Sequence, residues 1–358
     1  MPEIFGRRFD RSALEARVGE LQQICGITPI LYDDGRARGT RGFLLRTGGG
    51  LELEIIADRA LDVVGAAYRG IPLTWRGPGG LAHPAYSEPG IEAFERNFFG
   101  GLMTTCGLQA FGPSGKDVDG AWQQHGYINH APAQAVAHRA VWENDRCTFE
   151  ISGTIRDARM FGASLRLERT WRVVLGENTL RLHDRVTNDG GARAPHMMLY
   201  HCNAGFPLLD EELELSVTHR AMHPRDDDAR AALDVWNRGG PPESGFKEQV
   251  FIHEPSAGED GWARASASNA RLDGGRGVEL TVCYRPDQLP ALMTWRMLGV
   301  KTYVMAMEPA NCPTIEGRIA ARERGTLPFL EPGETREYEL EFSARTLSRA
   351  LGSAAFGS

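Results

Sequence analysis

The chain has 358 residues, of which 42% are hydrophobic, and a formal net charge of -7 at pH 7. Lys and Arg are spread along the sequence without a basic cluster, which disfavours a nucleic-acid partner. No apolar run approaches the ~20 residues that span a bilayer, and the N-terminus lacks the basic and apolar regions of a signal peptide. We therefore expect a soluble, cytoplasmic protein with no membrane partner.

The six cysteines are widely spaced and include no Cys-x-x-Cys pair, which disfavours a zinc ribbon or a thioredoxin-like site. In a chain without a secretion signal, we expect buried, reduced thiols. Cys106, Cys202 and Cys312 lie beside the motifs described below, where packing as small residues is favoured over a nucleophilic role.

In chain order, the first expected element is a helix over residues 10–22, capped by Asp10 or Ser12. Most later elements are expected to be strands, because apolar and polar residues alternate in short segments between turn signals. These segments are residues 51–56, 148–155, 165–173, 180–186, 212–217, 277–282 and 336–342. Many short strands and few helices predict a mostly β protein of the sandwich type.

The loop signals are too short to separate independent folding units. We predict an N-terminal extension over residues 1–40, which packs as a helix or hairpin on the core. A β-sandwich domain follows over residues 41–347, and the small residues near the C-terminus predict a frayed tail over 348–358.

Two motifs place a proton-transfer group at the end of an apolar run. His201 follows residues 197–200, and Glu308 follows the strand-like residues 303–307 and precedes Pro309. An imidazole and a carboxylate can act as general acid and general base. The alternatives are structural, namely a core histidine bonded to backbone and a carboxylate that caps a turn.

Seven motifs together resemble the aldose 1-epimerase (mutarotase) superfamily, and most closely a bacterial, DUF4432-like branch of largely unassigned substrate. They are residues 58–63, 70–75, 99–108, 125–129, 200–207, 307–313 and 330–335. The resemblance implies a large antiparallel β super-sandwich of the galactose mutarotase type, with few short helices and a sugar-binding cleft on one sheet.

The resemblance also implies an isomerase of carbohydrate metabolism that interconverts the anomers of an aldose. Glu308 would take the proton of the C1 hydroxyl, and His201 would protonate the ring oxygen. Since only protons move, neither a metal nor a cofactor is required. We expect Glu308 to be ionised at neutral pH and a nearby carboxylate to raise the pKa of His201.

Seven further residues are expected to bind the sugar: His125, Arg59, Asp62, Asn203, Trp295, Arg296 and Gln249. His125 resembles the His-Gly of mutarotases, although the residues that follow, 127–130, depart from the family pattern. Arg59 could instead pair with Asp62 or Glu54. Asn203 could bond only to the following turn, and Trp295, like Trp75, could be a core residue. Glu248 and Gln249 flank the region where the wider family has an acidic sugar-binding residue.

Other readings stay open at this point. A zinc site at His219 and His223 is disfavoured, because this segment is strand-like and lacks a nearby carboxylate. A non-catalytic carbohydrate-binding or sensing protein would use the same cleft, as would a sugar lyase or hydrolase. Hydrolysis normally needs two carboxylates, and Glu308 alone stands out. The candidate phosphate ligands of a phosphosugar are Arg59, Arg76, Arg96, Arg296 and Arg318. The sugar and the oligomeric state stay open, with a homodimer as one possibility.

Overall fold

A computed structural model describes residues 1–87, 90 and 92–347, so the predicted tail at 348–358 lies outside the described residues. Strands dominate, and the helices of the described ranges are six residues long or shorter. They are α1 (Arg11–Glu15), α2 (Ala93–Asn97), α3 (Asp227–Arg230), α4 (Leu272–Gly275) and α5 (Arg318–Glu323). In these ranges no helix is long and apolar enough to cross a membrane.

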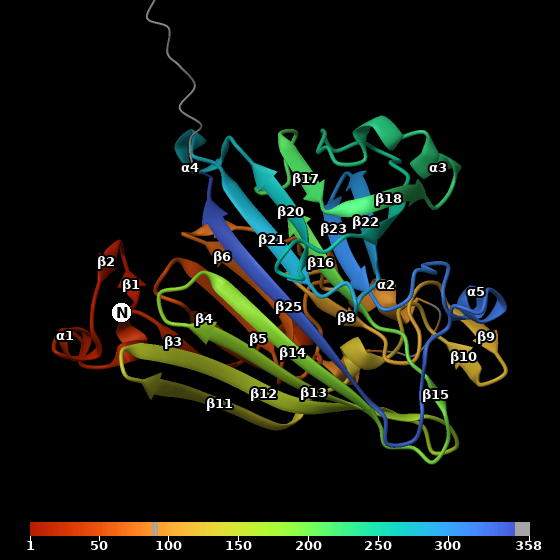
Figure 1. Cartoon of the computed structure of the whole chain (residues 1–358), viewed down its shortest axis with the longest axis horizontal. Helices are drawn as coiled ribbons and strands as arrows, with labels where there is room; N and C mark the ends of the chain where they lie inside the picture. Colours follow the sequence, from red (N-terminus) through yellow and green to blue (C-terminus); the bar gives the residue numbers. More distant parts are fainter. Residues whose placement is uncertain (88–89, 91, 348–358) are drawn as a thin grey trace, which may run out of the picture.

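An eight-stranded antiparallel sheet forms one layer (Figure 1). Its strands, in spatial order, are β11 (Gln134–Glu143), β12 (Arg146–Ala158), β13 (Ser164–Val174), β14 (Thr179–Asn188), β25 (Thr335–Thr346), β21 (Val278–Tyr284), β20 (Ala263–Asn269) and β17 (Leu213–Val217). The alternating segments predicted at 148–155, 165–173, 180–186, 212–217, 277–282 and 336–342 all fall largely within these strands.

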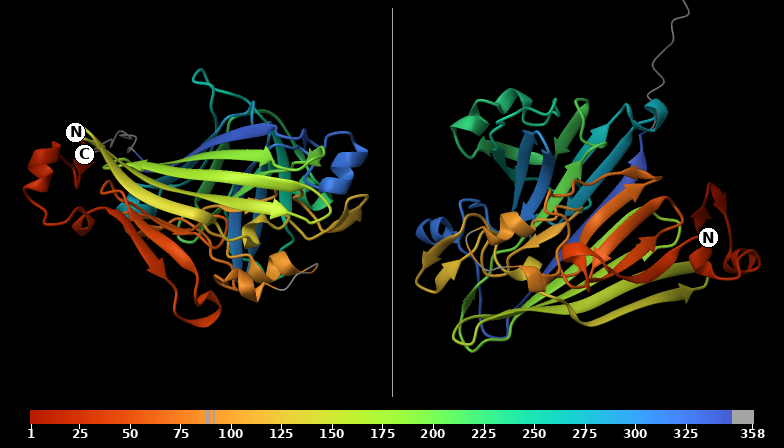
Figure 2. Two further views of the ribbon diagram at one scale, coloured as in Figure 1. Left: turned by 90° about the horizontal axis from the view of Figure 1, so that it is seen from below. Right: turned by 180° about the vertical axis from the view of Figure 1, so that it is seen from behind.

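A six-stranded sheet and a five-stranded sheet pack against the same side of this layer (Figure 2). The six-stranded sheet has the order β18 (His219–Pro224), β19 (Gln249–Pro255), β22 (Ala291–Gly299), β23 (Thr302–Ala310), β16 (Leu199–Gly205) and β8 (Thr104–Cys106). The five-stranded sheet has the order β3 (Gly26–Leu31), β4 (Arg41–Arg46), β5 (Leu51–Ile56), β6 (Asp62–Tyr68) and β7 (Ile71–Pro72). Three short pairs complete the strands: β1 (Glu3–Ile4) with β2 (Arg7–Arg8), β9 (Gly115–Asp117) with β10 (Gly120–Trp122), and β15 (Ala194–Pro195) with β24 (Phe329–Leu330).

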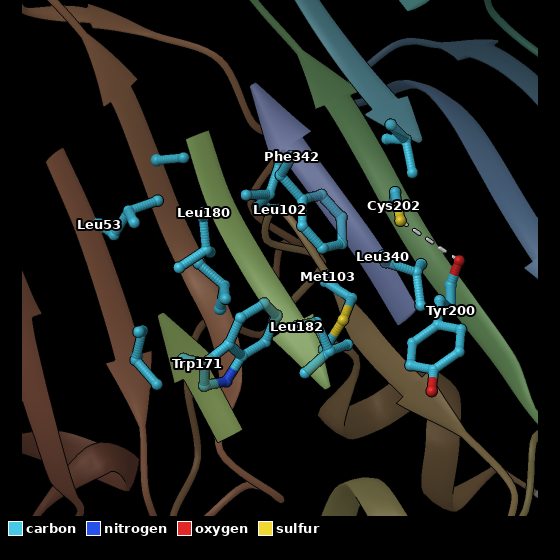
Figure 3. Packing of buried hydrophobic residues seen from close by; sticks show 14 of the residues in the cluster. Leu53, Leu102, Met103, Trp171, Leu180, Leu182, Tyr200, Cys202, Leu340 and Phe342 are labelled. Carbon is cyan, nitrogen blue, oxygen red and sulfur yellow. Dashed lines mark hydrogen bonds between the residues drawn. The ribbon is translucent and has the colours of Figure 1, made fainter. Parts of the chain in front are cut away.

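The main core lies between the eight-stranded sheet and the two smaller sheets. Trp171 on β13, Leu182 on β14 and Phe342 on β25 meet Tyr200 and Cys202 on β16 in one buried cluster (Figure 3). The predicted mostly β sandwich is confirmed, and one face of β16 is committed to this core.

The N-terminal segment differs from the expectation in one respect. The Asp10 side chain caps α1 by accepting a hydrogen bond from the Ala13 N–H at 2.6 Å, but the helix ends at Glu15 and not near residue 22. Gly19 lies in the stretch that stays non-helical, and glycine is unfavourable in an exposed helix interior. β3 pairs with β4 across residue 40, so the two sides of the predicted boundary share one sheet.

Candidate active site

The pairing of β16 with β23 brings together His201 and Glu308. The register joins Leu199 to Ala310 and Cys202 to Met307, which sets His201 directly opposite Glu308. His201 Nε2 lies 3.4 Å from Glu308 Oε1. Because side chains alternate along a strand, both groups face away from the core that Tyr200 and Cys202 enter.

Asn203 lies on the same face of β16, two residues after His201. Its Nδ2 donates hydrogen bonds to the carbonyls of His201 and Gly101, at 2.9 and 3.1 Å. Three buried atoms of this face have no hydrogen-bond partner among the described residues: His201 Nδ1, Asn203 Oδ1 and Glu308 Oε1. His201 and Glu308 therefore touch without a well-formed hydrogen bond, which leaves both able to bond to a ligand.

Burial shifts the pKa values of this pair in opposite directions. The two side chains are only 6% and 4% exposed. Burial lowers the pKa of His201 to about 3, assisted by His125 and opposed by Asn203. Burial raises the pKa of Glu308 to about 8, assisted by the charge of Glu248 and opposed by Arg225. The expectation that a carboxylate would raise the pKa of His201 is therefore wrong, because burial lowers this pKa and also keeps the neighbouring Glu308 protonated at neutral pH.

Aromatic rings enclose His201. The rings of Phe98, Trp295 and His125 lie edge-on to the imidazole, with centroid distances of 5.0, 5.4 and 5.8 Å. Phe98 directly follows α2, and Phe94 within α2 packs on both Phe98 and His125 at 4.6 Å. The short helix α2 thus forms a roof over the pair.

His125 lies in the loop after β10 and has a left-handed backbone, with φ of 57°. Its Nδ1 accepts a long hydrogen bond from the Gly112 N–H at 3.4 Å, which assigns the ring proton to Nε2. Burial lowers the pKa of His125 to about 4. At neutral pH, His125 is therefore an uncharged hydrogen-bond donor.

Glu248 lies at the rim of the site and is held from two sides. The Trp295 Nε1–H donates to Glu248 Oε2 at 3.0 Å, and the Arg225 guanidinium pairs with Oε1 at 3.0 Å. Arg225 also donates to Asp226, the N-cap of α3, at 2.7 Å. Glu248 supplies a second carboxylate close enough to raise the pKa of Glu308.

A family comparison matches residues 37–344 to DUF4432, a domain of unknown function. The chain belongs to this family. Among curated proteins, no relative was found.

Comparison of this DUF4432 protein with solved structures gives three informative matches. A candidate aldose 1-epimerase from Klebsiella pneumoniae superposes with a TM-score of 0.83 at 21% identity, over 95% of this chain and 87% of that chain. A galactose mutarotase-like protein from Clostridium acetobutylicum gives 0.60 at 13% identity, over 91% and 100%. The galactose 1-epimerase from Lactobacillus acidophilus gives 0.57 at 14% identity, over 90% and 99%. The chain thus has the galactose mutarotase-like fold.

Four of the predicted substrate-binding residues of the DUF4432 chain lie away from the His201–Glu308 pair. Arg296 pairs in register with Gln249 on one side and Met305 on the other. Alternation along β23 sets Met305 and Glu308 on opposite faces, so Arg296 and Gln249 face away from the pair. Arg296 donates to Gln249 Oε1 at 2.8 Å and to the Arg238 carbonyl at 3.0 Å.

Arg59 and Asp62 are both occupied by protein groups. The Arg59 guanidinium donates to the carbonyls of Ala82, Asn97 and Asn129. Arg59 as a whole residue is 1% exposed. Asp62 accepts from the Thr105 N–H at 2.8 Å and from Arg169 at 2.7 Å, within the core. Neither residue is placed to contact a sugar, and Arg59 forms no ion pair with Asp62 or Glu54.

The cysteines beside the motifs are poor candidates for a nucleophile. All six cysteines are free thiols, and Cys106, Cys202 and Cys312 are fully buried. Burial raises the pKa of each of these three thiols, far above the ordinary value for Cys106 and Cys202. Packing accounts for their positions, because the reactive form of cysteine is the thiolate.

Proposed function

We propose that this protein is an aldose 1-epimerase-like isomerase that interconverts the anomers of a free sugar at the His201–Glu308 pair. The observation that carries the proposal is a buried acid–base pair, 3.4 Å apart, whose pKa values bracket neutral pH from below and above. Between about pH 3 and about pH 8, the pair holds one proton. One group is then always an acid and the other a base.

The reaction requires such a pair at short range. The C1 hydroxyl and the ring oxygen are bonded to the same carbon, so the base and the acid must act on two neighbouring atoms. Glu308 donates its proton to the ring oxygen as the bond between C1 and the ring oxygen breaks. At the same time neutral His201 accepts the proton of the C1 hydroxyl, and this C–O group becomes the aldehyde. Rotation about C1–C2 and the reverse transfers close the ring on the other face and restore the pair.

This assignment reverses the roles expected from the sequence, where Glu308 was the base and His201 the acid. The two assignments differ in the position of one shared proton, because ring closure uses each group in the opposite sense from ring opening. Burial favours the uncharged arrangement, with the proton on Glu308, in the resting site.

The groups around the pair offer hydrogen-bonding atoms and apolar surface that a sugar ring can use. His125 offers an N–H donor, Asn203 an amide oxygen, and Glu248 a carboxylate at the rim. Trp295 and Phe98 supply apolar surface next to His201. Mixed apolar and polar lining of this kind is typical of a small-molecule site.

An unphosphorylated sugar fits the site better than a phosphosugar. The arginines considered as phosphate ligands are engaged elsewhere: Arg59 and Arg296 as described, Arg76 with Glu54, Arg96 with Glu92, and Arg318 with Asp117. A phosphate group would need several convergent cations that are free to bind it.

One observation favours a second candidate, a sugar hydrolase. Glu248 provides the second carboxylate near Glu308 that hydrolysis normally requires. Its carboxylate oxygens are, however, already bound by Arg225 and Trp295. The reaction products separate the two candidates, because a hydrolase releases a second fragment and an epimerase does not.

The test is saturation-transfer NMR on free aldoses at neutral pH, with the wild type, Glu308→Gln and a matched control, Glu52→Gln, on the exposed side of β5. We expect accelerated anomer exchange in at least one sugar. It should fall by roughly 10²–10⁴-fold in Glu308→Gln and stay unchanged in the control. No acceleration across pentoses, hexoses, deoxy sugars and phosphosugars would rule out the epimerase.

Three sequence-based statements stay predictions. They are a cytoplasmic location, a homodimeric state and the domain boundaries at residues 40 and 347.

A further inference from the structure

The turn at residues 58–62 is buried and conformationally unusual. Ala60 and Leu61 have φ of 54° and 56°, and both are fully buried. Consecutive non-glycine residues with positive φ are unfavourable, and they persist only where the surroundings over-determine the conformation. This turn belongs to a motif that the sequence singled out and that the proposed chemistry does not use.

Hydrogen bonds fix the turn to several parts of the fold. The Ala60 N–H donates to the Ala131 carbonyl at 2.9 Å, and the Ala60 carbonyl accepts from Arg169 at 2.9 Å. The Leu61 carbonyl accepts from the Trp171 indole at 2.8 Å. These bonds therefore hold the turn in place against β13 and against the loop that follows His125.

Arg59 extends from this turn toward the roof of the site. Its Nη1 donates to the Ala82 carbonyl and its Nη2 to the Asn97 carbonyl, each at 3.0 Å, while Nε donates to the Asn129 carbonyl. The guanidinium also packs on the Phe99 ring, with its central carbon 4.9 Å from the ring centroid. One planar group thus joins three segments that are far apart in the sequence.

Two of these three segments carry walls of the site. Asn97 ends α2 and precedes Phe98, whose ring contacts His201. The Asn97 side chain in turn donates to the Ala93 carbonyl at 2.8 Å, which holds the first turn of α2. Asn129 lies in the 3₁₀ turn that follows His125. A displaced guanidinium would therefore move both walls at once.

We propose that Arg59 is a positioning residue, whose guanidinium holds Phe98 and His125 at their distances from His201. Its effect on catalysis rests on the proposed function, whereas its effect on the loops does not. Its three nitrogens each donate to a backbone carbonyl, so Arg59 acts through these segments and not as a ligand of the sugar.

Arginine is suited to this role for a geometric reason. The guanidinium is planar and directs its N–H groups in several fixed directions, so it can bind three carbonyls at once. Lysine keeps the positive charge but has a compact ammonium on a flexible stem. Arg59→Lys therefore preserves the charge and removes the geometry, which separates the two contributions.

The test is hydrogen–deuterium exchange of the wild type, Arg59→Lys and Leu280→Ala. Leu280 lies in the core on β21, and its truncation supplies a destabilised control that leaves the Arg59 contacts intact. Exchange is compared at conditions of equal unfolding free energy. We expect faster exchange in Arg59→Lys around Ala82, through α2 to Phe98 and from His125 to Ala131, with no selective change there in Leu280→Ala.

Anomer exchange by the same variants provides the second measurement. We expect kcat/KM to fall about 10²-fold in Arg59→Lys, since small displacements of groups around a reacting centre cost rates of this order. Unchanged hydrogen–deuterium exchange in the three segments of Arg59→Lys, or the same change in Leu280→Ala, would overturn the proposal. If the wild type lacks anomer exchange but the segments loosen, the proposed function fails and the positioning role stands.

Discussion

At the scale of single residues, the His201–Glu308 pair is best understood as one shared proton. Removal from water disfavours the carboxylate and the imidazolium alike. The proton is therefore held on Glu308, and each of the two side chains is uncharged. The sequence-based expectation used ordinary pKa values and gave an ion pair. It could not include burial, because neither the contact between β16 and β23 nor the roof over it is visible in the order of residues.

The pH dependence of the reaction distinguishes these two descriptions. With the pKa of Glu308 at about 8, loss of its proton leaves the pair without an acid above that pH. We expect kcat/KM for anomer exchange to be flat from pH 5 to 7 and to fall about tenfold per pH unit above about 8. Saturation-transfer rates, corrected for the rate without enzyme, give this profile.

An ion pair with ordinary pKa values behaves differently. It would lose activity near pH 6.5, as the imidazolium deprotonates. A midpoint there would contradict the uncharged pair. Glu52→Gln should reproduce the wild-type profile, because Glu52 lies on the exposed side of β5.

At the scale of elements, segments in which apolar and polar residues alternate were predictable as strands. Which strands pair with each other in a sheet was not predictable. Residues 51–56 read as a half-buried strand and form β5 with the same bounds. The site depends instead on register. A shift of one residue turns a side chain to the other face, which is why Gln249 faces away from Glu308 while Glu248 is held beside Trp295.

The roof of the site left a weaker signal. Phe94 and Phe98 are four residues apart, a spacing that puts both rings on one side of a helix, but nothing in one sequence indicates what that side covers. Arg59 binds backbone carbonyls, which every residue has, so its partners leave no pattern to find. For Arg59 the family resemblance located the motif and the structure located the contacts, whereas Phe94 and Phe98 lie outside the motifs that carried the resemblance.

Removal of the Phe98 ring should raise the pKa of His201. The ring shields the imidazole from water, and burial is the main cause of the low pKa, about 3. In Phe98→Ala, we expect the pKa of His201 to move toward about 6.5, the ordinary value. Imidazole carbon and proton shifts, followed by NMR against pH, report this value directly.

The control for this experiment is Phe161→Ala. Phe161 is 91% exposed and lies in the turn between β12 and β13. The same pKa for His201 in the wild type and in Phe98→Ala would show that the Phe98 ring does not shield the imidazole.

At the scale of the whole molecule, three sheets share one main core, and the site occupies the face of the six-stranded sheet that this core leaves free. The strand β16 serves both purposes, with Tyr200 and Cys202 in the core and His201 and Asn203 at the site. A buried ionisable pair is unfavourable for folding, so we expect function to oppose stability at this position.

Glu308 should make the stability of the whole protein fall as pH rises. Its pKa is about 8 in the folded chain and ordinarily 4.5, so between these values the folded state binds more protons than the unfolded state. The free energy of unfolding therefore decreases from about pH 4.5 to about pH 8, by at most about 1.4 kcal/mol per unit of pKa difference.

Glu308→Gln lacks this loss. The free energy of unfolding of the variant minus that of the wild type should therefore be larger at pH 9 than at pH 4. Urea unfolding of both proteins at the two pH values measures the difference, with Glu52→Gln as the control that should follow the wild type. An equal difference at pH 4 and pH 9 would mean that Glu308 ionises in the folded protein as it does in water, and the uncharged pair would have to be abandoned.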